Sequence, residues 1–579
     1  MPVEEALLPK DLAAAEGMVN VQINGVWHRF PKGTRLIEAI GKSGDEVPHY
    51  CYHPKLSSPG NCRMCMVEIG MPARLAPGAE PTYDDEGYLP IQWMPRPAIS
   101  CATMVSENLG VRTKSTLVEE ARHGVMEFLL ANHPLDCPIC DQAGECRLQE
   151  FAVGHGRGGS RFVEQKTKKP KNVDIGPRIR LDDERCIMCS RCIRFMDEVA
   201  MDPVLGFSER GGYTTLGVHP GRKLDHNYGL NTVDICPVGA LTCNDFRFQM
   251  RVWFLKETPS IDTNCGTGIN TVIWTRNDQV YRITPRENND VNSCWMPDSH
   301  RLNFHYLHGQ HRLTSSLVRD GDHHRSAPSH NAAGKVASAL KSAPKGTAAL
   351  VVSSRLTNEE MFLAKRLAEK CGISAIATVP REGEADDYLV AADRNPNTQG
   401  FLRIFGDQDR AATLQSLRDD VRSGKIRTLL TLQEDLLAPE AGFTQDDLEK
   451  LDFLASLHLL DNGTAAAADV VLAGSGFPEN RGSMINVTGR LQRLNRAINP
   501  PGEALTNWEW LATLLRETGA DVFDGEAAAF KALAASDELW QDLTLARIPD
   551  NGIQLYETGI KIPLVERERE RIARGEING

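Results

Sequence analysis

Apolar and polar positions divide the chain into an N-terminal part with short strands and a C-terminal part in which strands and helices alternate. Residues 19–30 alternate apolar and polar positions around Asn24 and Gly25, which predicts a β-hairpin. We expect Thr34 to cap the short helix that follows. Residues 117–131 have the spacing of an amphipathic helix. The N-terminal part is therefore of mixed α and β character.

Beyond residue 315 the apolar runs are longer and alternate with helical patterns. This alternation predicts a parallel, doubly wound sheet. The segments that carry the prediction are 346–354, 358–372, 373–379, 426–432, 454–461 and 468–474. Residues 154–180 are instead rich in glycine and basic residues, which indicates a solvated connector near a domain boundary.

Length and charge restrict the function. A chain of 579 residues holds several domains. Apolar residues make up 41% and charged residues 25%, as in soluble globular proteins, and the net charge of −12 disfavours nucleic acid as a ligand. The sequence has neither an apolar run of about 18 residues nor a basic leader, so we expect a cytoplasmic chain without a transmembrane segment.

The cysteines change this picture most. Of the 15 cysteines, 12 lie in residues 1–243 and 3 in the rest of the chain. The odd number, the close spacings and the lack of an export signal argue against a disulfide framework. We therefore expect the thiols to be metal ligands.

The first set of candidate ligands is Cys51, Cys62, Cys65 and Cys101. Two cysteines separated by two residues in a glycine-containing loop can hold one iron while distant cysteines hold another, which predicts a [2Fe-2S] cluster. A structural zinc ion also takes four cysteines. The gaps of 10 and 35 residues match a ferredoxin loop better than a zinc ribbon.

The second set is His133, Cys137, Cys140 and Cys146. Three cysteines this close can hold three irons of a [4Fe-4S] cube, and His133 is the one candidate inside the motif for the fourth iron. A histidine in such a turn is usually a surface residue or a satisfied core residue. The neighbouring cysteines are what favour a ligand role for it.

The third set is Cys186, Cys189, Cys192 and Cys236. Two-cluster ferredoxins have two runs of C-x2-C-x2-C-x3-C-P, each of which sends its last cysteine to the other cluster. Here the positions of the missing cysteines are occupied by Met196, His226, Gly229 and Thr232. One [4Fe-4S] cluster is therefore expected, and zinc seldom uses this spacing.

These motifs, in this order, resemble the large iron-sulfur subunit of bacterial respiratory complex I, the proton-pumping NADH:quinone oxidoreductase. The resemblance rests on the [2Fe-2S] loop and on three further motifs: HPLDCPICDQAGEC at 133–146, CIMCSRCIRF at 186–195 and DICPVGAL at 234–241. Residues 468–492 resemble the module of molybdopterin oxidoreductases. The resemblance extends over nearly the whole chain.

The resemblance implies a multidomain α+β and α/β fold. The expected domains are a β-grasp [2Fe-2S] ferredoxin domain (18–108), a small helical [4Fe-4S] domain with one histidine and three cysteine ligands (109–160), a ferredoxin-like [4Fe-4S] domain (161–250), a small domain with a degenerate cluster site (251–315), a truncated molybdopterin-oxidoreductase-like doubly wound α/β domain (316–545) and a charged tail (546–579).

The resemblance also implies a function and partners. The chain is expected to relay electrons from the flavin/NADH-binding subunit through one [2Fe-2S] and two [4Fe-4S] clusters toward quinone, as an oxidoreductase subunit with no substrate site of its own. Further implied partners are the small [2Fe-2S] subunit, the ferredoxin-like subunit with two [4Fe-4S] clusters, and the quinone-site subunits. The implied location is peripheral, on the cytoplasmic side of the bacterial inner membrane, with membrane contact only through partners.

Other cofactors are not expected on this chain. GSGFPE at 474–479 fails the dinucleotide fingerprint, and GKS at 41–43 lacks the upstream glycine of a phosphate loop. The α/β region is also short for a complete pterin enzyme. We therefore expect no NAD, flavin or molybdopterin.

One expected departure concerns the domain at 251–315. Some bacterial members of the family carry a further [4Fe-4S] cluster there, and the corresponding positions here are Asp262, Cys265, Ile269 and Cys294. Isoleucine offers no donor atom, and aspartate is a hard oxygen donor poorly matched to a cluster that selects thiolates. We predict that this cluster is absent and that the chain holds about ten irons.

Two other classes of protein remain as alternatives. An iron-sulfur subunit of a hydrogenase or formate dehydrogenase would need a cysteine-rich hydrogen-activating domain or a complete molybdopterin domain, yet only 3 cysteines follow residue 243. A zinc-stapled scaffold without redox function would be colourless, so a visible absorption spectrum separates it from the other classes.

Overall fold

The computed structural model describes residues 16–72 and 90–577, which form two compact units. One unit comprises Met1–Val252 with Arg569–Gly579, and the other comprises Trp253–Glu568. The first unit contains all three cysteine sets. The second contains the degenerate positions and the α/β region.

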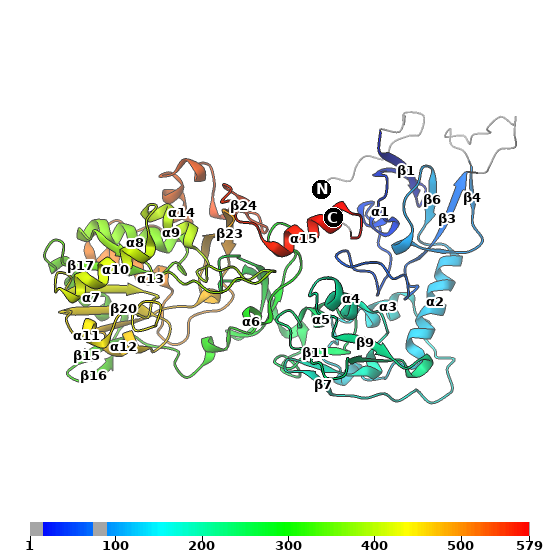
Figure 1. Cartoon of the computed structure of the whole chain (residues 1–579), viewed down its shortest axis with the longest axis horizontal. Coiled ribbons are helices and arrows are strands. Elements are labelled where there is room, and N and C mark those ends of the chain that lie inside the picture. The colour runs from blue at the N-terminus through cyan, green and yellow to red at the C-terminus, as the bar shows by residue number, and fades with distance from the viewer. Residues whose placement is uncertain (1–15, 73–89, 578–579) are drawn as a thin grey trace. The chain divides into compact units, whose positions relative to one another are not determined.

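The first unit begins with a six-stranded sheet of order β2-β1-β6-β3-β4, with β5 paired to β3. The predicted hairpin is confirmed, because β1 and β2 are antiparallel and Asn24 and Gly25 adopt φ values of 50° and 88°. Helix α1 (Leu36–Lys42) lies beside this sheet (Figure 1), and its apolar side chains are buried in the same core. The strands are β1 (Met18–Ile23), β2 (Val26–Pro31), β3 (Met66–Pro72), β4 (Ile91–Trp93), β5 (Ala98–Ile99) and β6 (Leu109–Arg112).

The start of α1 differs from the prediction. Arg35 takes the N-cap position, and the Thr34 hydroxyl donates to the carbonyl of Pro31 at 2.8 Å. The N–H of Leu36 donates instead to the carbonyl of Thr103 at 2.8 Å. A contact distant in sequence thus satisfies a backbone group for which the sequence suggested a local cap.

The rest of the first unit consists of short elements around the other cysteines. Helix α2 (Thr116–Ala131) confirms the predicted helix, and the Ser115 side chain accepts the N–H of Val118 at its start. Residues 156–172 are exposed over most of their length, as expected of a connector. The remaining elements are α3 (Arg147–His155), β7 (Val173–Gly176), β8 (Ile179–Leu181), α4 (Arg191–Glu198), β9 (Leu205–Ser208), β10 (Thr215–Val218), α5 (Asn231–Asp234) and β11 (Leu241–Cys243).

The second unit opens with a three-stranded antiparallel sheet of β12 (Lys256–Ile261), β13 (Asn270–Arg276) and β14 (Gln279–Pro285). The short helix α6 (Asp298–Arg301) follows it. Another three-stranded sheet pairs β22 (Gly482–Ile485), β23 (Arg490–Leu494) and β24 (Ile553–Gln554). These small sheets belong to the same unit as the larger sheet described next.

A seven-stranded sheet of order β16-β15-β21-β20-β19-β17-β18 forms the main body of the second unit. Its parallel strands are β17 (Ala348–Val352), β18 (Ala375–Ala377), β19 (Thr428–Leu432), β20 (Phe453–His458) and β21 (Val470–Ala473). The antiparallel strands β15 (Leu317–Asp320) and β16 (His323–Ser326) complete one edge. The predicted doubly wound sheet is confirmed.

Strands buried on both faces explain this architecture. Leu350 and Val352 point to one apolar core, and Ala349 and Val351 to another. In Figure 1, α13 and α11 accordingly lie on opposite sides of β20. The first face packs against α7 (Ser329–Ser342), α8 (Asn358–Cys371), α9 (Thr398–Phe405), α13 (Asn507–Thr518) and α14 (Glu526–Ala534), and the second against α10 (Arg410–Arg422), α11 (Gln445–Leu448) and α12 (Gly463–Ala467).

The charged C-terminal segment forms helix α15 (Pro563–Ala573). Leu564 and Val565 are buried, and the carboxylate of Glu568 accepts the indole N–H of Trp295 at 2.7 Å. These three residues share one helix face. The segment that we expected to be a solvated tail therefore has a packed side.

Candidate iron-sulfur centres

The first candidate set surrounds the loop between α1 and β3. Cys51, Cys65 and Cys101 are fully buried or nearly so, and Cys62 is half-buried. The Cys51 thiol interacts with those of Cys62 and Cys101. The Cys101 thiol interacts in turn with that of Cys65. The structure therefore brings together the four sulfurs predicted to hold a [2Fe-2S] cluster.

Backbone geometry shapes this loop. Gly60 and Arg63 adopt φ values of 63° and 60°, in the left-handed region that most residues avoid. A Cβ at Gly60 would lie 2.7 Å from Cδ1 of Ile99, so the loop needs glycine there. The Ser58 hydroxyl donates to the carbonyl of Cys101 at 2.9 Å, which ties the loop to the last ligand position.

The second set lies between α2 and α3. Cys137 opens a 3-10 helix, and Cys146 directly precedes α3. Cys137 lies close enough to Cys140 for their charges to interact, and so does Cys140 to Cys146. Burial raises the pKa of Cys146 to about 11, while backbone N–H groups at the start of α3 act in the opposite direction. A helix N-terminus of this kind favours a bound thiolate.

His133 lies in the turn after α2. Its Nδ1 is buried and has no hydrogen-bond partner in the part of the chain that the structure describes. Burial lowers the pKa of His133 to about 4, so the ring is neutral near pH 7, which is the metal-binding form. An unpaired buried nitrogen is costly, and coordination to iron would satisfy a ring nitrogen in this setting.

The third set surrounds the start of α4 and the end of α5. The Cys192 thiol lies within reach of the charges of Cys186, Cys189 and Cys236. Burial raises the pKa of Cys189 to about 12 and that of Cys192 well above its usual value. Iron binding would therefore release protons from these thiols. The four sulfurs are gathered as the spacing predicts.

Unusual backbone conformations support the third set as well. Met188 and Ser190 have φ values of 53° and 60°, although neither is glycine. Such conformations persist where the surrounding structure enforces them, and they are common at functional sites. They turn the chain sharply between successive cysteines of this set.

One apolar cluster in the first unit contains side chains from all three sets. Its cysteine members are Cys51, Cys62, Cys146, Cys186, Cys189 and Cys236. Tyr50 is fully buried in this cluster and lies near both Cys62 and Cys146, whose charges add to burial in raising its pKa. Its ring also packs edge-on against Phe151, with 5.4 Å between the ring centres.

Arg191 links the first and third sets in a similar way. The charges of Cys51, Cys189 and Cys236 all act on its guanidinium, which donates to the carbonyls of Tyr52 and, at 3.2 Å, Ile235. A cation in this position offsets the negative charge that ligated thiolates would bring. The three sets are therefore neighbours within one buried core.

Close packing around the sulfurs also fits bound clusters. A Cβ at Gly239 would lie 2.3 Å from Sγ of Cys140, so only glycine leaves room beside this sulfur. Gly239 follows Cys236 in the chain, and the N–H of Arg147 donates to the carbonyl of Pro237 at 3.1 Å. The second and third sets thus hold each other in place, and their residues fit the clusters that the spacings predict.

The fourth set does not fit a cube. Ile269 is buried but has no donor atom, and Cys294 is only half-buried. The structure instead gathers Asp262 and Cys265 with His300, whose ligand atoms all lie within 4.8 Å of one another. The sequence carries no signal for His300, because it stands 35 residues after Cys265, outside any recognisable spacing.

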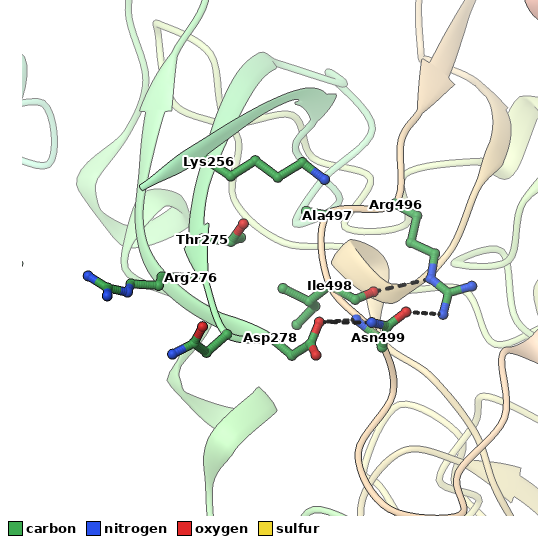
Figure 2. A pocket seen from close by; sticks show the side chains of 9 residues that line it. Lys256, Thr275, Arg276, Asp278, Arg496, Ala497, Ile498 and Asn499 are labelled. Carbon is green, nitrogen blue, oxygen red and sulfur yellow. Dashed lines mark hydrogen bonds between the residues drawn. The ribbon is translucent and has the colours of Figure 1, made fainter. Parts of the chain in front are cut away.

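A cavity of about 390 Å³ lies elsewhere in the second unit, and Figure 2 shows its lining. Arg496 donates to the carbonyl of Ile498 at 3.2 Å and to the side chain of Asn499 at 2.6 Å. Asn499 donates in turn to Asp278 at 2.9 and 3.0 Å. Because these polar groups bind one another, nothing here indicates a ligand.

Helices able to span a membrane are absent from the two described ranges. None of the helices there combines the length and the apolar character needed to cross a bilayer.

Models of protein families match most of the chain in sequence order. Their descriptions are 2Fe-2S iron-sulfur cluster binding domain (16–116), NADH-ubiquinone oxidoreductase-G iron-sulfur binding region (122–161), NADH-quinone oxidoreductase subunit 3, ferredoxin-like domain (176–242), NADH-ubiquinone oxidoreductase NDSU1/NuoG-like, 4Fe-4S domain (255–305) and Molybdopterin oxidoreductase (419–517). The chain thus contains both [2Fe-2S] and [4Fe-4S] binding domains.

A relative covers nearly the same extent. The mitochondrial 78 kDa subunit of NADH-ubiquinone oxidoreductase from Candida albicans is 37% identical over 86% of this chain and 82% of its own length. The chain belongs to the family of 75–78 kDa iron-sulfur subunits of NADH-quinone oxidoreductase. The expected order of domains, from ferredoxin to molybdopterin-oxidoreductase-like, is the order in which the family models match.

Other members of this family match in part. The 78 kDa subunit of Neurospora crassa is 39% identical over 62% of this chain and 46% of its own length. The corresponding NADH-quinone oxidoreductase subunit of Rickettsia felis is 37% identical over 61% of this chain and 49% of its own length. The chain thus spans about half the length of these two relatives in the alignments. A solved chain of an NAD+-reducing [NiFe]-hydrogenase is 27% identical, with a TM-score of 0.33, over 40% of this chain and 91% of that one.

Proposed function

We propose that this chain carries electrons within NADH:quinone oxidoreductase through one [2Fe-2S] cluster and two [4Fe-4S] clusters. The ligands of the [2Fe-2S] cluster are Cys51, Cys62, Cys65 and Cys101. The ligands of one [4Fe-4S] cluster are His133, Cys137, Cys140 and Cys146, and those of the other are Cys186, Cys189, Cys192 and Cys236. The clusters, when bound, supply one-electron redox chemistry.

The observation that carries this proposal is the apolar cluster shared by the three sets. Electron tunnelling falls steeply with distance, so a relay needs its centres close together and held rigidly. Tyr50 contributes by filling the space between the first and second sets, and Arg191 by bridging the first and third. All the proposed cysteine ligands except the exposed Cys137 are buried or half-buried, which limits access of water. Burial and hydrogen bonds to sulfur tune reduction potentials.

The proposal includes specific partners and a location. Electrons enter from the flavin/NADH-binding subunit and leave to the ferredoxin-like subunit with two [4Fe-4S] clusters and then to the quinone-site subunits. The small [2Fe-2S] subunit is a further partner. Family membership supports this order. The chain then works at the cytoplasmic side of the bacterial inner membrane and reaches it only through these partners.

Metal analysis and low-temperature EPR of the purified full chain test the proposal. We expect about ten irons per chain and three separable signals. Cys51→Ser should remove the [2Fe-2S] signal alone, and Cys189→Ser should remove one [4Fe-4S] signal. Cys371→Ser, on α8 in the other unit, is the matched control and should change neither iron nor spectrum. A colourless zinc protein, or iron unaffected by both ligand variants, would overturn the proposal.

A further inference from the structure

Three side chains with metal-binding donor atoms meet in the second unit, and none of them belongs to the three cysteine sets. Asp262, Cys265 and His300 are 4, 0 and 7% exposed, and their ligand atoms lie within 4.8 Å of one another. Across residues 16–72 and 90–577, no other group of three or more histidine, cysteine or acidic side chains meets this distance.

Different elements hold the three residues in place. Asp262 directly follows β12, Cys265 lies in the loop before β13, and His300 lies on α6. The N–H of Asp262 donates to the carbonyl of Ile269 at 2.7 Å. This hydrogen bond closes the loop between residues 262 and 269, the two positions where a cube would need the missing sulfurs.

Contacts with both oxygens fix the orientation of the Asp262 carboxylate. One oxygen lies 2.7 Å from Nδ1 of His300, and the other accepts the side-chain N–H of Asn264 at 2.5 Å. Hydrogen bonds of this kind, from an amide to a carboxylate, fix the orientation of metal-binding carboxylates in proteins. The Asp262 oxygen beside His300 is therefore the one that can act as a metal ligand.

An Asp–His pair alone does not account for the third member. A buried cysteine with only a packing role belongs in apolar surroundings, whereas Cys265 lies against a buried carboxylate and a ring nitrogen. Its Sγ lies 3.9 Å from the carbonyl oxygen of Leu389 and also contacts Thr267 and the backbone of Ala391.

The geometry points to a mononuclear Zn²⁺ site formed by a carboxylate oxygen of Asp262, the thiolate of Cys265 and a ring nitrogen of His300. Zinc accepts oxygen, nitrogen and sulfur ligands together, whereas iron-sulfur cubes select thiolates. Binding releases the thiol proton of Cys265 to solvent. It also breaks the hydrogen bond between Asp262 and His300, whose proton moves through solvent to the other ring nitrogen when Nδ1 binds zinc. Each of these groups then donates an electron pair to zinc.

A cavity lies next to this group, although none of the three ligand residues lines it. Asn264, which contacts Asp262, also lines a cavity of about 330 Å³ together with Asn303 and Tyr306. A water molecule from this cavity completes the tetrahedral coordination that zinc prefers. The ion then ties the end of β12 to α6, a structural role that the missing cluster would otherwise have had.

Zinc and iron analysis of the full chain with its clusters tests the site. We expect about one zinc per chain, and X-ray absorption at the zinc edge should show one sulfur at about 2.3 Å and lighter ligands near 2.0–2.1 Å. Asp262→Asn, Cys265→Ser and His300→Ala should each lower zinc severalfold, with iron unchanged. Cys294→Ser, in the same segment but outside the group, is the matched control and should keep its zinc.

Three results would overturn the site. The first is less than about a fifth of an equivalent of zinc after dialysis against excess zinc. The second is zinc retained in both Cys265→Ser and His300→Ala. The third is about fourteen irons per chain with a signal lost in Cys265→Ser, which would show a cluster instead.

Because iron content reports on the three cluster sites and zinc on this one, failure here is distinguishable from failure of the proposed relay. Circular dichroism would identify a variant that unfolds. In that case the zinc content of the conservative variant Asp262→Asn tests the site.

Discussion

Among single residues, His133 differs most from its neighbours because it would bring a neutral ligand into a cluster of thiolates. A thiolate in its place adds a negative charge, which disfavours the further negative charge of reduction. Histidine ligation accompanies a higher potential in Rieske centres for the same reason. We predict that His133→Cys still assembles a cluster and lowers its midpoint potential, as measured by EPR-monitored redox titration. A potential that stays equal or rises would contradict the charge argument.

Glu360, on α8, gives a prediction about pH. It is buried, one of its oxygens accepts the N–H of Thr357 at 2.8 Å, and burial raises its pKa to about 8. The folded state therefore keeps a proton that the unfolded chain releases near pH 4.5, so this contribution to stability is full below about 4.5 and is lost as pH rises to about 8.

Glu360→Gln removes this titration but keeps an acceptor for the cap. We expect urea unfolding of the variant to lose less stability between about pH 5 and 8, by up to about 1.4 kcal/mol per pH unit. Glu369→Gln, exposed on the same helix, is the control and should keep the parental slope. Equal slopes for the parent and Glu360→Gln would show that Glu360 is ionised in the folded protein.

Ligand residues could be predicted from the sequence only where they lie close to one another along the chain. Cysteines two residues apart identify their own partners, because a short loop limits where their sulfurs can go. His300 carries no such signal, since only the packing of α6 against the end of β12 brings it to Asp262. The orphaned Nδ1 of His133 is likewise a property of burial that no spacing reveals.

Among the elements, the turn after α5 offers the sharpest prediction. Gly239→Ala would place a Cβ against Sγ of Cys140, where only 2.3 Å is available. We expect this variant to lose the [4Fe-4S] signal of the His133 set and about four irons. Gly217→Ala on β10 is the matched control, because a Cβ there meets nothing within 4 Å. Full iron in Gly239→Ala would mean that the turn can move aside.

Elements were predictable where burial follows a simple period. The hairpin of β1 and β2 and the parallel strands of the second unit have alternating or continuous apolar runs, and they formed as predicted. The prediction that Thr34 caps α1 was wrong, because the carbonyl of Thr103, far away in sequence, accepts the N–H of Leu36 at the helix start. The packed face of α15 was hidden because the charged residues of this helix outnumber its buried apolar residues, Leu564 and Val565.

For the whole molecule, the prediction concerns what the chain cannot do alone. The sequence contains no dinucleotide fingerprint, so the purified chain should not reduce a dye with NADH, although dithionite should reduce its clusters. A dye-reduction assay with and without the flavin-bearing partner measures this. Turnover by the chain alone at a rate near that of the complex would contradict it.

The core that the three ligand sets share implies a shared vulnerability. An oxidant that destroys one cluster would leave thiols without iron and backbone groups without partners inside a core to which the neighbouring sets also contribute side chains. The neighbouring clusters would keep their own ligands and signals, but looser packing around them would let oxidant and water reach them sooner. The second unit, with its separate cores, would stay folded.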